Sequence, residues 1–148
     1  MINFIDDNIL NYSISKSEKE SKLLNDLYRE TYLKVLNPRM ISGHYQGRIL
    51  SLISKIISPK KILEIGTYTG YSAICLCEGM DKDGTLHTID NNKELVEIQN
   101  KYFKKANLKD TWHCQLTVHK YFTGFRPLQV INETNGDCVA TDNIAVVW

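Results

Sequence analysis

The sequence lacks the features that mark a nucleic-acid binder, a membrane protein or a secreted protein. Its 148 residues carry 18 basic and 17 acidic side chains, so no basic excess exists to attract phosphate backbones. No apolar run approaches the roughly 20 residues that a membrane helix needs. Residues 1–10 contain Asp6 and Asp7 but no basic residue, which argues against a secretory signal. We therefore expect one globular domain with no nucleic-acid partner and no membrane partner.

The sequence lacks paired cysteine motifs, although it has four cysteines. Cys75 and Cys77 stand two apart in an expected helix, where they face different sides, and Cys114 and Cys138 are isolated. Without a Cys-x-x-Cys pair, neither a zinc knuckle nor a redox motif is supported. Free thiols are typical of a reducing compartment, so we expect a cytoplasmic protein.

The residues that are present indicate a ligand site near the middle of the chain. Residues 62–65 form a short apolar strand that includes Glu64, a loop bounded by Gly66 and Gly70 follows, and a helix begins near Tyr71. This arrangement binds nucleotide-like ligands, because glycine lets the backbone approach closely and the helix N-terminus offers free N–H groups. The loop lacks the third glycine of the dinucleotide enzymes, which weakens a nicotinamide oxidoreductase interpretation. The Glu64 carboxylate suits a ligand with a positively charged amino group, and we predict S-adenosylmethionine.

A second strand ends in an acid where such a site needs one. Residues 84–90 read as a strand that closes with Asp90, 24 residues after Gly66. At this place in a βαβ unit, a carboxylate accepts hydrogen bonds from ribose hydroxyls. The competing interpretation is that Asp90 only caps the helix expected from about Lys93. We favour the ribose role because both halves of the motif occur in the right order.

Hydrophobic periodicity predicts further helices. One is expected over residues 16–36, with a capping box of Ser17 and Glu20, and another over residues 43–57. The predicted buried face of the helix over 43–57 consists of Ile49, Leu50, Ile53, Ile56 and Ile57. A later amphipathic helix carries Leu95, Ile98, Tyr102 and Ala106. We predict a single α/β domain with a Rossmann-like fold: N-terminal helices over 1–58, a cofactor-binding βαβα core over 59–110 and C-terminal strands over 111–148.

From about residue 27 to residue 108, the sequence resembles the cation-dependent O-methyltransferases of the catechol and caffeoyl-CoA type, including their bacterial relatives. The segments that carry the likeness are YRET at 28–31, MISGHYQG at 40–47, LEIGTYTGYS at 63–72 and TID at 88–90. The resemblance implies an S-adenosylmethionine-dependent methyltransferase fold and O-methyltransferase activity. It assigns Glu64 to the amino group of the cofactor, Ser72 to its carboxylate and Asp90 to its ribose. The full cofactor-binding set that it implies is Met40, Ser42, Glu64, Gly66, Thr67, Tyr68, Ser72 and Asp90.

The last forty residues match the family in one place. Short strands are expected over 114–118, 128–131 and 138–147. Residues 136–144 (GDCVATDNI) resemble the family's segment of a glycine, an apolar strand and an Asp-Asn pair that ligates the catalytic metal. The resemblance thus implies that Asp142 and Asn143 hold Mg²⁺ or another divalent cation, which prefers such oxygen ligands.

Another part of the family pattern is missing. Relatives carry an acid-rich strand with a lysine, which supplies a further metal ligand and often the catalytic base. Residues 111–136 contain no Asp, and their one Lys is Lys120. We therefore assign no catalytic residue. Either the segment has diverged, or the sequence is internally shortened and truncated.

Two functions remain compatible with the sequence. The first is a metal-assisted transfer of a methyl group from S-adenosylmethionine to a small aromatic, catechol-like hydroxyl. The second is a shortened, non-catalytic module for S-adenosylmethionine binding or for protein interaction. The nearly complete cofactor signature favours the enzyme, whereas the missing strand favours the module, and we adopt the methyltransferase interpretation. We also expect a homodimer, because the helix over 16–36 displays tyrosines and leucines and a shortened sheet leaves an edge uncovered.

Overall fold

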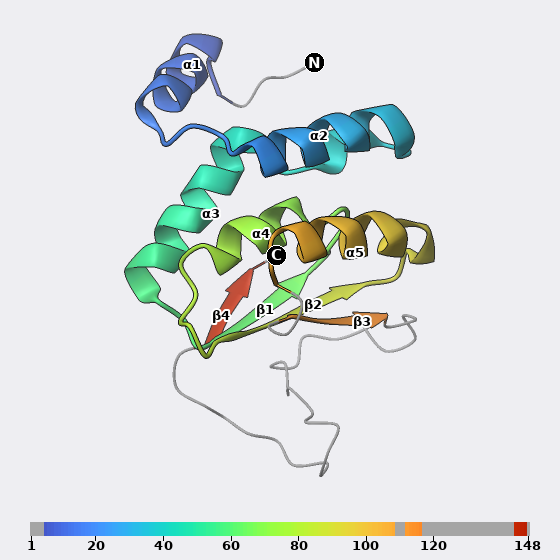
Figure 1. Cartoon of the computed structure of the whole chain (residues 1–148). Coiled ribbons are helices and arrows are strands. Elements are labelled where there is room, and N and C mark those ends of the chain that lie inside the picture. The colour runs from blue at the N-terminus through green and yellow to red at the C-terminus, as the bar shows by residue number, and fades with distance from the viewer. Residues whose placement is uncertain (1–4, 109–111, 117–143, 148) are drawn as a thin grey trace, which may run out of the picture.

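A computed structural model describes residues 5–108 and two further strands, 112–116 and 144–147 (Figure 1). The elements before the first strand are α1 (Asp7–Lys16), α2 (Lys22–Lys34), the short 3-10 helix η1 (Pro38–Met40) and α3 (Gly43–Ile57). The elements that follow are β1 (Lys61–Ile65), α4 (Tyr71–Cys77), β2 (Thr85–Asp90), the 3-10 helix η2 (Lys93–Leu95), α5 (Val96–Lys105), β3 (Trp112–Leu116) and β4 (Ile144–Val147). Within these ranges, no helix has the length and apolar character needed to cross a bilayer.

The four described strands form one parallel sheet in the order β3-β2-β1-β4. Helix α4 connects β1 to β2, and η2 with α5 connects β2 to β3, as parallel neighbours require. In this register Glu64 of β1 lies beside Thr88 of β2, so the carboxyl ends of the two strands meet at one edge. The predicted α/β, Rossmann-like architecture is confirmed.

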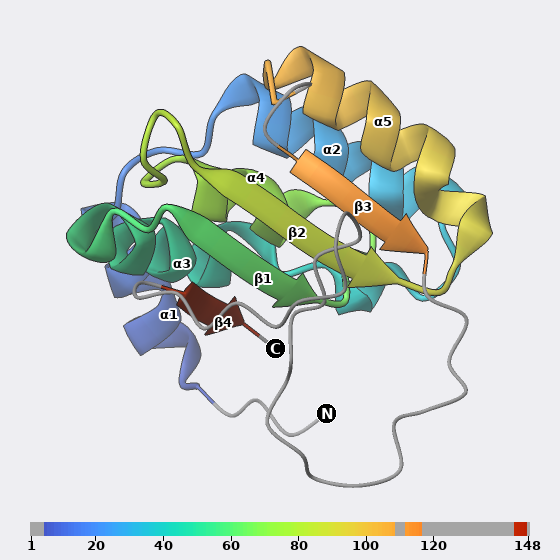
Figure 2. The same ribbon diagram turned by 90° about the horizontal axis from the view of Figure 1, so that it is seen from below.

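All of the described helices lie on one face of the sheet. Figure 2 views the sheet from its other face, with the helices behind it. Helices α4 and α5 lie next to the sheet, and α2 lies over them (Figure 1). The core between these layers is made of apolar side chains that are almost fully buried, namely Leu24, Leu27, Ile62, Tyr71, Ala73, Leu86, Tyr102 and Phe103. This burial is the main driving force that fixes the strand ends and the loops beside them.

The helix predicted over residues 16–36 is confirmed only for Lys22–Lys34, and its predicted start was wrong. Helix α1 ends at Lys16, and the Ser17 hydroxyl donates back to the carbonyl oxygen of Ser13 at 2.7 Å. Helix α2 begins only at Lys22, and its cap is Ser21, whose hydroxyl accepts from the Leu24 N–H at 3.2 Å. The Ser17–Glu20 capping box therefore does not form. Instead, Glu20 accepts a hydrogen bond from the Tyr71 hydroxyl, which ties the start of α2 to α4.

Helix α3 has its predicted bounds, but its predicted buried face was wrong. Four of the five predicted residues are exposed, with relative accessibilities from 41% to 75%; they are Ile49, Ile53, Ile56 and Ile57. The face that meets α4 is instead built from Gly47, Arg48, Ser51 and Ser54. A Cβ on Gly47 would lie 2.7 Å from the Tyr71 ring, so the small residues allow a close approach of the helices.

Other expectations near the C-terminus have mixed outcomes. Strand β3 covers Trp112–Leu116, two residues earlier than the predicted strand at 114–118. Strand β4 covers Ile144–Val147 and confirms the end of the strand predicted over 138–147. The rest of that strand and the strand predicted over 128–131 lie outside the described residues.

Candidate functional site

The loop between β1 and α4 is the centre of the candidate site. Gly66, Tyr68 and Gly70 all have positive φ angles, of 97°, 47° and 91°. A Cβ on Gly70 would lie 2.8 Å from the Phe103 ring, so both the backbone angle and the packing require glycine there. A Cβ on Gly66 would meet no atom within 4 Å. The backbone at Gly66 therefore faces open space, which a ligand can occupy.

A buried carboxylate lies directly before this loop. Glu64 is 2% exposed, and its two carboxylate oxygens accept from the hydroxyls of Ser72 and Thr88, each at 2.6 Å. Burial raises the pKa of Glu64 to about 7, although the two hydroxyl donors oppose this rise. A cationic group brought to Glu64 would favour its charged form and lower this pKa.

Thr88 supports Glu64 and is a functional residue that the sequence analysis did not assign, whereas Thr67, which was predicted to bind the cofactor, supports Thr88. The hydroxyls of Thr67 and Thr88 lie 2.6 Å apart, and both residues are buried. Since Thr88 gives its one proton to Glu64, Thr67 is the donor to Thr88. The signal was present, because Thr88 lies two residues before Asp90 and alternation places residues i and i+2 on one face of a strand.

Asp90 lies at the end of β2 and holds the glycine loop. Its Oδ2 accepts from the Tyr68 N–H at 2.6 Å, and its Oδ1 accepts from the Asn92 N–H at 2.9 Å. The helical segment that follows is capped by Asn92, whose side chain accepts from the Glu94 N–H. The interpretation of Asp90 as a simple helix cap was therefore wrong. Asp90 is partly exposed, so its carboxylate can accept further hydrogen bonds from a ligand.

Tyr68 is fixed by three separate parts of the chain. Its N–H donates to Asp90, its carbonyl oxygen accepts from the Gln99 side chain at 2.7 Å, and its hydroxyl lies 3.2 Å from the Leu36 carbonyl oxygen and 3.1 Å from that of Asn37. Gln99 is 1% exposed and is a second supporting residue that sequence reasoning missed. These contacts stabilise the left-handed conformation of Tyr68, which costs a non-glycine residue about 1–2 kcal/mol.

Met40 and Ser42 lie in the segment that the Tyr68 hydroxyl holds. Met40 ends η1 and is 68% exposed, whereas Ile41 beside it is buried in the core. Ser42 precedes α3, and its hydroxyl does not cap that helix. Both side chains can therefore meet a ligand without breaking a bond that the fold needs.

The predicted metal ligands Asp142 and Asn143 lie outside the described residues. Within the part of the chain that is described, no three His, Cys, Asp or Glu side chains come together to hold a metal ion.

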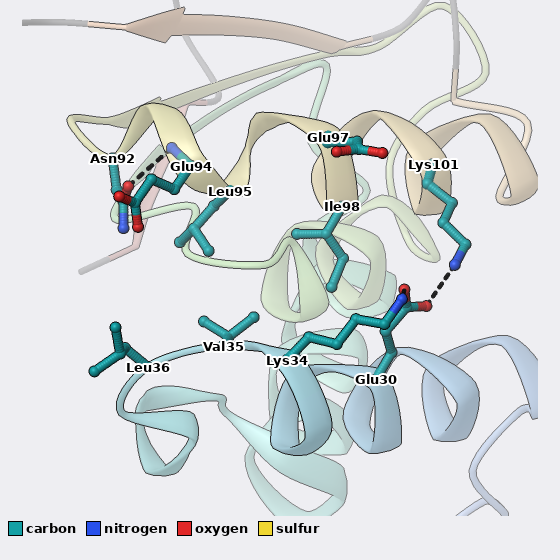
Figure 3. A pocket seen from close by; sticks show the side chains of 10 residues that line it. All are labelled: Glu30, Lys34, Val35, Leu36, Asn92, Glu94, Leu95, Glu97, Ile98 and Lys101. Atoms are coloured by element: carbon teal, nitrogen blue, oxygen red, sulfur yellow. Dashed lines mark hydrogen bonds and ion pairs between the residues drawn. The ribbon is translucent and has the colours of Figure 1, made fainter.

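A cavity of about 340 Å³ lies between α2 and the η2–α5 segment (Figure 3). Its lining includes Leu36, Leu95 and Ile98, and also Glu30 and Lys101, which form an ion pair of 2.6 Å. Lys101, Tyr102 and Lys34 all donate to Glu30 and lower its pKa to about 2. None of the predicted cofactor residues lines this cavity, so we do not regard it as the cofactor site.

Comparisons with known proteins agree with this geometry. Residues 13–119 match the sequence model of a protein family described as O-methyltransferase. Caffeoyl-CoA O-methyltransferase 1 of Zea mays is 34% identical over 100 residues, which make up 68% of this chain and 38% of that protein.

Solved structures show the same fold. The O-methyltransferase TomG of Streptomyces achromogenes, in complex with SAM, has a TM-score of 0.64 at 26% identity and matches 72% of this chain and 48% of its own. The SAH-bound methyltransferase PaMTH1 of Podospora anserina reaches a TM-score of 0.69 at 24% identity, over 78% of this chain and 51% of its own. The chain thus spans about two fifths of the curated relative and about half of each solved neighbour.

Proposed function

Because this chain belongs to the O-methyltransferase family, we propose that it binds S-adenosylmethionine at the glycine loop and transfers the methyl group to a hydroxyl of a small aromatic, catechol-like molecule. The observation that carries the proposal is the buried Glu64 carboxylate behind an open glycine loop. A buried acid that is held by two hydroxyl donors suits a positively charged amino group, whereas a phosphate group at the same place would be repelled.

The other cofactor contacts follow from the same edge of the sheet. We assign Ser72, in the first turn of α4, to the cofactor's carboxylate, to which its hydroxyl would donate in exchange for the bond to Glu64, and the backbone of Gly66 and Thr67 to its methionine chain. Asp90 keeps lone pairs for the ribose hydroxyls while it holds the Tyr68 N–H. Met40 and Ser42 close over the cofactor from the segment before α3. Asp90→Ala then weakens cofactor binding by roughly 1.5–3 kcal/mol, the range for hydrogen bonds to a charged group.

For the methyl transfer itself, the protein mainly has to position the acceptor oxygen against the methyl carbon. The transfer is an in-line displacement, in which the acceptor oxygen attacks the methyl carbon and the sulfonium sulfur leaves as a neutral thioether. Phenols have a pKa near 10, so the acceptor is protonated at neutral pH. It must lose this proton to become the more nucleophilic phenolate. We keep the proposal that Asp142 and Asn143 bind a divalent cation, which when bound favours the phenolate form of a vicinal diol.

Calorimetric titration with S-adenosylmethionine and with a nicotinamide cofactor tests the cofactor assignment. We expect the first to bind and the second not to bind. Glu64→Gln should weaken S-adenosylmethionine binding, whereas Glu97→Gln, at an exposed position of α5, should leave it unchanged. Binding of the nicotinamide cofactor alone would refute the assignment.

Transfer of a labelled methyl group to catechol tests the reaction. We expect methyl transfer to catechol, and we expect a chelator to abolish it. Asp142→Ala and Asn143→Ala should each reduce the transfer. Transfer that survives both the chelator and Asp142→Ala would refute the metal role. Cofactor binding without any transfer would favour the non-catalytic module over the enzyme.

We further propose that the chain forms a homodimer, through a different surface from the one predicted. The apolar residues of α2 are largely in the core, whereas α3 exposes isoleucines and a leucine. Among the described strands, β4 is one edge of the sheet, and helix α3 lies near this edge (Figures 1 and 2). An apolar helix face beside the edge of the described part of the sheet suits self-association.

A further inference from the structure

The Tyr68 hydroxyl joins two segments that are far apart in the sequence. It lies 3.2 Å from the Leu36 carbonyl oxygen and 3.1 Å from the Asn37 carbonyl oxygen. A phenol has one proton, so these two carbonyl groups share a single donor. The bond connects the glycine loop after β1 to the chain just after α2.

The segment over residues 36–42, which we call the strap, has few other attachments. Leu36 is 82% exposed and Met40 is 68% exposed, and only Ile41 is anchored in the core. Asn37 adopts a left-handed conformation with φ of 57°, which places mild strain at the start of η1. Few buried contacts and a strained turn are the properties of a segment that opens locally at low cost.

The other end of this connection is the glycine loop, where we propose that the cofactor binds. The backbone of Tyr68 is bonded to Asp90 through its N–H and to Gln99 through its carbonyl oxygen. A ligand that binds Asp90 therefore acts on a carboxylate that also positions Tyr68. The rigid Tyr68 ring in turn links this backbone to the two carbonyl groups of the strap.

We propose that Tyr68 is a positioning residue whose hydroxyl latches the strap to the glycine loop, so that cofactor binding at Asp90 also orders the strap. This proposal rests on the proposed function for its cofactor. It assigns to Tyr68 a task that differs from a direct contact with the ligand. The latch holds Met40 and Ser42 over the site, and the same latch must release before the cofactor can leave.

Tyr68→Phe tests the latch, because it removes the hydroxyl and keeps the ring. The matched control is Tyr45→Phe, since the Tyr45 hydroxyl in α3 makes no hydrogen bond to any described residue. Hydrogen exchange of the amides of Met40 and Ile41 reports on the strap, because these N–H groups donate to the carbonyl oxygens of Asn37 and Pro38. The amides of α3 report on global stability.

Without cofactor, we expect the strap amides to exchange roughly 2- to 10-fold faster in Tyr68→Phe than in the wild type, the effect of one net hydrogen bond. The α3 amides and the Tyr45→Phe control should not change. With S-adenosylmethionine, the wild-type strap should gain protection and the Tyr68→Phe strap should gain much less. Cofactor affinity should fall by a similar factor.

Three results would overturn the latch. One is strap exchange that is equal in Tyr68→Phe and the wild type. Another is faster exchange to the same extent in α3, which would mean a global loss of stability. The third is full cofactor-induced protection of the strap in Tyr68→Phe. If the wild type binds no S-adenosylmethionine, the proposed function fails, and the cofactor-free comparison alone decides whether the latch exists.

Discussion

The Ser72 hydroxyl donates to Glu64 across the glycine loop, with Oγ 2.6 Å from Oε1. This bond joins the first turn of α4 to the end of β1, and the Thr88 hydroxyl occupies the other oxygen of the same carboxylate. Both oxygens of Glu64 thus accept from hydroxyl groups, yet no cationic side chain among the described residues forms an ion pair with it. A buried acid without a counter-ion is costly to ionise, and this predicts a pH effect.

We expect S-adenosylmethionine binding to weaken as the pH falls below about 7, the raised pKa of Glu64. Protonated Glu64 carries no charge to attract the ammonium group, so binding at pH 6 requires the loss of a proton. Calorimetry in buffers of different ionisation enthalpy should detect this proton release. Affinity that is flat from pH 5.5 to 8 would contradict the assignment of Glu64 to the amino group.

Glu64 should also set a pH dependence of stability in the ligand-free protein. Its pKa is raised from 4.5 in the unfolded chain to about 7 in the fold, so its contribution is fully present below pH 4.5 and is lost as the pH rises through 7. We expect the free energy of unfolding of Glu64→Gln, relative to that of the wild type, to be higher at pH 8 than at pH 5. The difference should be up to about 3 kcal/mol in urea unfolding. An equal effect at both pH values would show that the pKa of Glu64 is not raised.

Two glycines of one loop provide a matched pair of variants. Gly66→Ala and Gly70→Ala both place a Cβ at a positive φ, which costs about 1–2 kcal/mol. Only Gly70→Ala also pushes into the Phe103 ring, so it should lose a further 1–3 kcal/mol of stability, roughly the cost of overpacking. Gly66→Ala should lose only the cost of the positive φ in stability, and it should in addition weaken cofactor binding. Thermal unfolding with and without S-adenosylmethionine separates the two, and equal effects of both variants would contradict this account.

The sequence could predict the glycine loop and the end of β2, because both depend on local chemistry. Gly66 and Gly70 have the positive φ angles that glycine permits, and Asp90 lies beside the loop as its spacing predicts. The role of Gln99 could not be predicted in this way, since it reaches Tyr68 from a helix 31 residues away in the sequence. Such a contact depends on how the helices pack, which no local pattern records.

The error on α3 has a similar physical cause. Its isoleucines and its small residues both repeat with a helical period, and periodicity alone does not say which face meets α4. The face with the small residues Gly47, Ser51 and Ser54 meets α4. On this face the buried Arg48 forms two hydrogen bonds to Glu78, at 2.8 and 2.9 Å. Ser54 adds a hydrogen bond to the carbonyl oxygen of Leu76. A partly buried ion pair between helices is therefore part of the structure that the hydrophobic pattern missed.

This ion pair leads to a stability prediction. Arg48→Leu leaves the partly buried Glu78 with Ser51 and with Lys55, whose Nζ lies 3.8 Å from its carboxylate, and it should lower the free energy of unfolding by about 1–3 kcal/mol. Arg29→Leu, at an exposed position of α2, is the control and should change little. In the double variant Arg48→Leu with Glu78→Leu, much of the loss should return, because no unpaired carboxylate remains. A double variant that is less stable than Arg48→Leu would contradict the ion-pair account.

The last prediction concerns the exposed face of α3, which consists of Ile49, Leu52, Ile53, Ile56 and Ile57, with relative accessibilities from 41% to 75%. If this face joins two copies, Ile53→Lys with Ile56→Lys should convert the dimer to a monomer of about 17 kDa in sedimentation equilibrium. The control is Leu33→Lys, because Leu33 is 74% exposed but lies on α2. A lysine pair at the interface would bury charge without a partner, whereas the control places a lysine on exposed apolar surface elsewhere. A wild-type monomer at high concentration, or equal loss of the dimer in the control, would refute this surface.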